Sequence, residues 1–121
     1  MDNDNIMIKM RADGKYIAVA TYSRGRGHRG PFLLYLEELE EWCRDGFEWH
    51  LRDEYCGNSI SLSAGDRFVN AEIWWRADDT ENAPGFFQRY SVPLESLRSL
   101  LSVGTSFRYL YALSGKGDDT P

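Results

Sequence analysis

The sequence predicts an α+β protein in which two short helices cover a single antiparallel or mixed sheet of about six to eight short strands. Most of the chain alternates apolar and polar residues, which is typical of half-buried strands. Turns of about two to five residues join most of these segments, and connections that short produce antiparallel pairs. Two further segments repeat apolar residues at the spacing of an amphipathic helix. We therefore expect the helices to pack against one face of the sheet.

The first helix is predicted at residues 36–45, and the rest of the chain is organised around it. Its apolar residues Leu36, Leu39 and Cys43 fall at i, i+3 and i+7, while glutamates fill the opposite side. Gly46 follows at the point where a residue in the left-handed conformation would end the helix.

The second helix is predicted at residues 93–103. Pro93 fixes a backbone angle suited to a first turn, and Gly104 marks the end. Residues 32–35, directly before the first helix, are apolar. Their spacing fits either a first helical turn or the end of a strand.

The remaining periodic segments are predicted as strands. The Asp13–Gly14 pair predicts a tight hairpin turn between the first two, and residues 68–92 predict a long hairpin. The predicted strands are residues 6–10, 16–22, 47–52, 59–63, 68–76, 86–92 and 105–113.

The length of 121 residues predicts one domain, residues 1–121, with flexible tails at 1–5 and 114–121. No apolar run approaches the ~20 residues that a membrane span requires. The first ten residues are acidic and polar, unlike a signal peptide. Two cysteines are too few for a disulfide framework, so free thiols are expected. These features predict a soluble, cytoplasmic protein without a membrane partner.

No catalytic or metal-binding motif is recognisable. Cys43, His50 and Cys56 lack the close pairing of structural zinc ligands. His50, Asp53 and Glu54 could form an acid–base cluster, but His50 and Asp53 would point to opposite sides of a strand. They are better explained as a solvated face and a turn. We therefore expect no catalytic residue, metal or cofactor, and a protein that is not an enzyme.

The segment from 24 to 30 combines arginine with glycine. We predict a flexible loop whose side chains stay out of the core. Its Arg24, Arg26, His28 and Arg29 could hold phosphates or the carboxylates of a partner. Alternatively, the charges only keep the loop soluble, or the loop folds back on the glutamates at 37–41.

Acidic residues form the opposite kind of candidate site. Glu37 and Glu41 on the first helix, with Asp78 and Asp79 in a loop, are either solvated surface or contacts for a basic partner. Trp74 falls on the polar side of its strand. This parity predicts that its side chain is exposed or lies in an interface, with a foreign partner or in a homodimer.

These features favour a non-catalytic protein that binds another macromolecule, most simply a protein. In size, acidic charge and aromatic content the whole chain resembles the small immunity proteins of bacterial toxin systems and the small inhibitors of phages; no motif carries the likeness. One alternative is a nucleic-acid-associated protein that uses the arginine loop, although the net charge of −5 argues against it. The other is a small enzyme or ligand-binding fold whose site is assembled from distant residues.

Overall fold

The computed structural model describes residues 4–77 and 85–109. It confirms the α+β class, the antiparallel strands and both helices. In chain order the elements are β1 (Asn5–Met10), β2 (Tyr16–Ser23), β3 (Gly27–Tyr35), α1 (Leu36–Arg44), β4 (Leu51–Tyr55), β5 (Asn58–Ala64), β6 (Phe68–Trp75), β7 (Phe86–Pro93), α2 (Leu94–Val103) and β8 (Phe107–Tyr109). The predicted strand 105–113 is thus represented by β8, and residues beyond 109 lie outside the described part.

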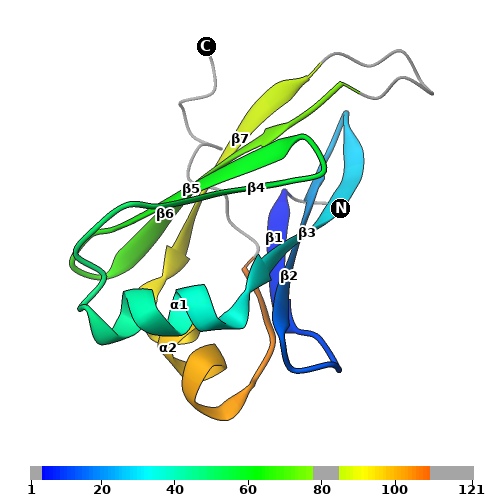
Figure 1. The fold of residues 1–121 in the computed structure, drawn as a ribbon. Helices are drawn as coiled ribbons and strands as arrows, with labels where there is room; N and C mark the ends of the chain where they lie inside the picture. The colour runs from blue at the N-terminus through cyan, green and yellow to red at the C-terminus, as the bar shows by residue number, and fades with distance from the viewer. Residues whose placement is uncertain (1–3, 78–84, 110–121) are drawn as a thin grey trace.

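The strands form two sheets, so the expectation of one sheet was wrong. The first sheet contains β3, β2 and β1, and the three-residue strand β8 extends it next to β1. The second has the order β4-β5-β6-β7, and every pair in both is antiparallel. The physical reason is the connection through α1, which carries the chain away from β3 and lets a second sheet begin. Figure 1 shows both helices at one end of the molecule.

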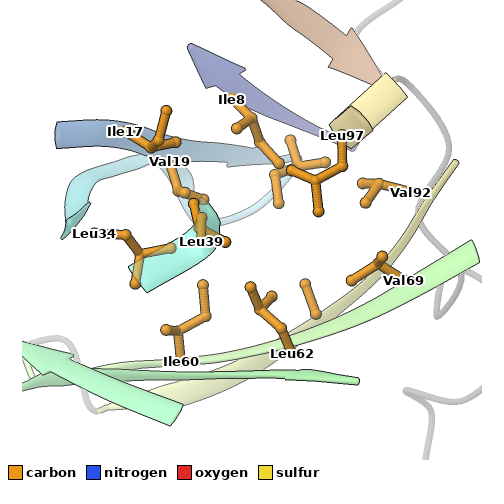
Figure 2. A pocket seen from close by; sticks show the side chains of 12 residues that line it. Ile8, Ile17, Val19, Leu34, Leu39, Ile60, Leu62, Val69, Val92 and Leu97 are labelled. Carbon is orange, nitrogen blue, oxygen red and sulfur yellow. The ribbon is translucent and has the colours of Figure 1, made fainter. Parts of the chain in front are cut away.

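The core lies between the two sheets, which cover each other's apolar faces. Figure 2 shows Ile8 and Val19 of the first sheet pointing toward Ile60 and Leu62 of the second. An enclosed cavity of about 20 Å³ remains there, lined entirely by apolar side chains. That is space for about one water molecule, and polar partners to hold one are missing from its lining. The helices complete this core at one end instead of covering a sheet face.

The first helix begins at Leu36, after a strand, which settles the alternatives left open for residues 32–35. Leu39 and Trp42 are buried, as the amphipathic pattern predicts. The second helix ends as predicted, because Gly104 adopts φ +75° and its N–H bonds the Leu100 carbonyl at 2.9 Å.

The predicted strand at 47–52 was placed too early, because β4 begins only at Leu51. Phe47 takes φ +59°, and its ring meets the Trp42 ring edge-on at 4.9 Å between centroids. The Trp42 Nε1–H donates to the Trp49 carbonyl. The chain after α1 is therefore held as a turn by aromatic packing, although its residues alternate like those of a strand.

Gln88 of β7 links the two sheets by hydrogen bonds. Its Oε1 accepts from the Thr21 hydroxyl at 2.7 Å and from Trp75 Nε1–H at 2.8 Å, while its Nε2 donates to Ser23 at 3.0 Å. Burial raises the pKa of the neighbouring Tyr90 hydroxyl, so that it stays protonated at all ordinary pH values. This network satisfies polar groups that would otherwise be buried without partners.

Candidate functional site

The arginine hairpin, defined here as residues 24–29, packs against β7. The loop predicted at 24–30 was placed too long, because β3 already begins at Gly27 and pairs with β2. The guanidinium carbon of Arg26 lies 4.1 Å from the centroid of the Phe86 ring, and that of Arg29 lies 5.3 Å from it. His28 faces the Tyr22 ring at 4.8 Å. Cation–π stacking therefore engages two of the three arginines within the molecule.

The backbone of this hairpin is also fixed. The Arg24 N–H donates to the Asp4 carboxylate at 3.2 Å. Gly30 has φ +113°, and a Cβ there would lie 2.8 Å from the Val19 carbonyl oxygen, so only glycine fits. The hairpin does not fold back on α1. Strand β3 separates them by about 25–30 Å of extended chain, and Figure 1 shows the hairpin tip and α1 at opposite ends of β3.

A second charged region, which we call the acidic surface, consists of Glu37, Glu38, Glu41 and Asp45 of α1 and its C-cap, and Asp53 of β4. Glu38, Glu41 and Asp45 follow the i, i+3, i+7 spacing of one helix face. Partial burial is the main reason that the pKa of Glu38 is raised, and interaction with the neighbouring Asp53 carboxyl group and the charge of Glu41 raise it further.

Aromatic side chains stand at both ends of the acidic surface. Tyr35, 53% exposed, precedes α1 and stacks on Tyr16 with 4.9 Å between ring centroids. Hydrogen bonding and charge coupling to Tyr16 are the main reasons that the pKa of Tyr35 is raised. Trp49, 39% exposed, follows α1, and its Nε1–H donates to Asp45 at 3.0 Å. The region thus combines carboxylates with exposed aromatic area.

Trp74 lies on the exposed side of the β4–β7 sheet, which we call the outer face. Its position on the polar side of its strand agrees with the sequence prediction, although its indole is half-buried. The Phe87 ring of β7 lies 5.0 Å away between centroids and is 64% exposed. Gly85 fits closely against Trp74, since a Cβ at Gly85 would collide with the indole.

Strand register arranges the outer face in rows. One row contains Glu54, Ser59, Trp74 and Phe87, and the next contains Arg52, Ser61, Glu72 and Arg89. Two open depressions of about 490 and 350 Å³ lie over the small serines of β5 and share Arg52, Ser61 and Glu72. In the second row, Arg89 forms an ion pair with Glu72 at 3.1 Å.

The residues predicted as binding candidates therefore occupy separate surfaces. The arginine hairpin packs against the inner-facing Phe86, Trp74 faces outward from the same sheet, and Glu37 and Glu41 are exposed on α1. Asp78 and Asp79 lie outside the described residues. Two residues of these surfaces were not among the predicted binding candidates: Asp53, which is in β4 and not in a turn, and Phe87. Alternate residues of a strand face opposite sides of its sheet, so a buried Phe86 would have indicated that Phe87 is exposed.

Within residues 4–77 and 85–109, no group of three His, Cys, Asp or Glu side chains is placed to share a metal ion. Cys43 and Cys56 are both free thiols. Neither helix has the length and apolar character needed to cross a membrane. What the described residues offer chemically is exposed charge and aromatic area.

Comparison with known proteins assigns no family to this chain. No family model matches the sequence, and neither a curated protein nor a solved structure is significantly similar to it. The candidate surfaces must therefore be judged by their own geometry and charge.

Proposed function

We propose that this protein acts by binding a positively charged macromolecule through the acidic surface, as a non-catalytic protein inhibitor or immunity-type module of bacterial or phage origin. The proximity of the Asp53 carboxyl group to Glu38 carries this proposal, because that neighbouring carboxyl group disfavours ionisation of Glu38. A guanidinium or ammonium group from a partner would relieve that repulsion and donate hydrogen bonds to both carboxyl groups.

The arrangement of charge on α1 supports this proposal. Glu41 and the C-cap residue Asp45 lie at the end of the helix, where the helix dipole disfavours negative charge. Glu37 and Glu41 also repel each other at the i, i+4 spacing, which weakens a helix by a few tenths of a kcal/mol. The helix dipole favours Glu37 in the first turn, but it does not favour Glu41 and Asp45, so the use of these two charges in binding is the better explanation.

The aromatic residues at the ends of the acidic surface fit the same function. Carboxylates alone raise the rate of encounter with a cationic partner more than they raise its affinity. Tyrosine and tryptophan supply the apolar contact area that commonly dominates binding energy. Tyr35 and Trp49 are both exposed and are held in place, by Tyr16 and Asp45 respectively.

The test is a comparison of charge-reversal variants that contain the same number of changes. Wild-type protein, E37K/E41K and the control D66K/E95K would be used to capture partners from nuclease-treated lysate of the native host. All four substituted residues are exposed. We expect a basic protein to be retained by the wild type and the control, and its affinity for E37K/E41K, measured by calorimetry, to be at least ~tenfold weaker. Equal affinity for all three proteins would refute the acidic surface as the binding site.

A further inference from the structure

We propose that the outer face of the β4–β7 sheet binds a second copy of this chain, in an isologous dimer with a twofold axis. This surface is distinct from the acidic surface. It exposes Phe87 and leaves Trp74 half-buried beside it, which is apolar area that a monomer has no need to present to water.

The first argument is the charge of the face. The protein carries a net charge of −5, so two copies repel each other at long range. The outer face is different, because its exposed cations Arg52 and Arg89 are balanced by the exposed anions Glu54 and Glu72. It is therefore a surface on which two acidic molecules can approach each other without net repulsion.

The second argument is the order of charges along the strands. On β4, Glu54 and Arg52 occupy neighbouring outer-face positions, and on β7 Phe87 and Arg89 do the same. Consider a twofold axis that lies in the interface and runs across the strands, midway between these two rows. It places Glu54 of each copy opposite Arg52 of the other, since rotation exchanges the rows.

The same operation also pairs residues on the other three strands, and on β6 it brings Trp74 of each copy opposite Glu72 of the other. Each Arg89 comes opposite Phe87 of the other copy, where a cation–π contact can form. On β5 the small Ser59 and Ser61 face each other, which leaves space for the long flanking side chains. The face is thus self-complementary, as an isologous interface requires.

The size of the face indicates the strength of the dimer. Four strands about 4.8 Å apart and seven residues at about 3.4 Å each give a face of roughly 19 by 24 Å. Contact between two such faces buries about 900 Å² if the faces are treated as flat, which is below the range of stable interfaces and within that of weak, transient ones. We therefore expect a dimer that dissociates in the micromolar range.

Charge reversal on β4 tests the arrangement. R52E places a carboxylate opposite Glu54 of the other copy, and E54R places two guanidiniums opposite each other. Each variant alone should self-associate at least ~tenfold more weakly than wild type in sedimentation velocity. Mixed together, the two variants should form a heterodimer, because both opposed pairs of β4 residues are then of opposite charge. The double variant R52E/E54R should dimerise like wild type for the same reason.

Two controls make the result specific. R44E changes the net charge by the same amount on exposed α1 and should leave dimerisation unchanged. F87S should weaken it, while its circular dichroism spectrum stays native because Phe87 is exposed. A wild-type protein that stays monomeric at all concentrations would overturn the proposal. Failure of R52E and E54R to associate when they are mixed would also overturn it. The same holds if only a foreign protein, and no second copy, binds this face.

The dimer and the proposed function fail independently. E37K/E41K changes only the acidic surface, so it should weaken partner binding and leave the dimer intact. R52E should weaken the dimer and leave partner binding intact.

Discussion

The arginine hairpin and the acidic surface are both dense in charge, but their charged groups differ in what they contact within the molecule. In the hairpin, Arg26 and Arg29 lie over the Phe86 ring. On the acidic surface, the Glu38 carboxyl group has another carboxyl group, that of Asp53, as a neighbour that raises its pKa. A run of like charges in a sequence therefore indicates a binding surface only when the fold leaves those charges without compensation.

The chemistry of the two groups explains the difference. A guanidinium is planar and weakly hydrated, so it can stack on an aromatic ring while its edges stay in water. A carboxylate has no comparable contact with an apolar ring and is best stabilised by a donor. Arginine can consequently become part of a fold without an acidic partner, whereas crowded carboxylates remain available for an external cation.

The largest effect that tests this comparison is expected for Phe86→Ala. Phe86 is 8% exposed and supports both stacked arginines, so its truncation removes core packing and the anchor of the hairpin. We expect the free energy of unfolding to fall by about 3 kcal/mol or more in urea denaturation. Phe87→Ala is the matched control, since this neighbouring ring is exposed on the other side of the sheet, and at low protein concentration it should cost less than about 1 kcal/mol. Equal losses for the two variants would show that the hairpin is not anchored at Phe86.

Local elements of the fold were predictable because local rules determine them. The helix at 36–45, the stop at Gly104 and the hairpin at 68–92 follow from periodicity and turn residues, and all three are present. The division into two sheets was not predictable. Alternation identifies a strand with one buried face, but it does not identify what covers that face. A strand covered by a second sheet and a strand covered by a helix show the same alternation of apolar and polar residues.

The candidate site was predictable only in part. Parity placed Trp74 on the outer side of its strand correctly. The pairing of Trp74 with Phe87 depends on the register of β6 and β7, which the sequence pattern of these strands does not set. The contact between Glu38 and Asp53 joins a helix to a strand that was itself misplaced. Aromatic packing around Phe47 caused that shift, and alternation gave no sign of it.

A smaller effect is expected for Glu38→Gln, which keeps the shape of the side chain but removes its charge. The folded-state pKa of Glu38 is raised above its usual value of 4.5. The stabilising contribution of Glu38 is therefore complete below the unfolded-state pKa and is lost as the pH rises through the folded-state value. At neutral pH the variant should be the more stable protein, by about 0.5 kcal/mol or less because Glu38 is largely solvated.

This advantage of Glu38→Gln should shrink as the pH is lowered toward 4, which urea denaturation at several pH values would measure. Glu95→Gln is the matched control, because Glu95, like Glu38, lies in the first turn of a helix, where the helix dipole favours a carboxylate. It should therefore destabilise the protein slightly at neutral pH. A Glu38→Gln variant that is less stable than wild type at pH 7 would contradict the idea that the acidic surface is crowded.

The smallest effect is expected for nucleic-acid binding by the arginine hairpin. An acidic protein is repelled by the phosphate backbone, and two of the three hairpin arginines already stack on Phe86. Retention of the wild type on single- or double-stranded nucleic acid should be weak at physiological salt, and the R24A/R26A/R29A variant should behave in the same way. Tight, salt-sensitive binding that disappears in this variant would reverse the comparison. It would mean that stacked arginines remain available to a partner, and that the hairpin, not the acidic surface, is the site of recognition.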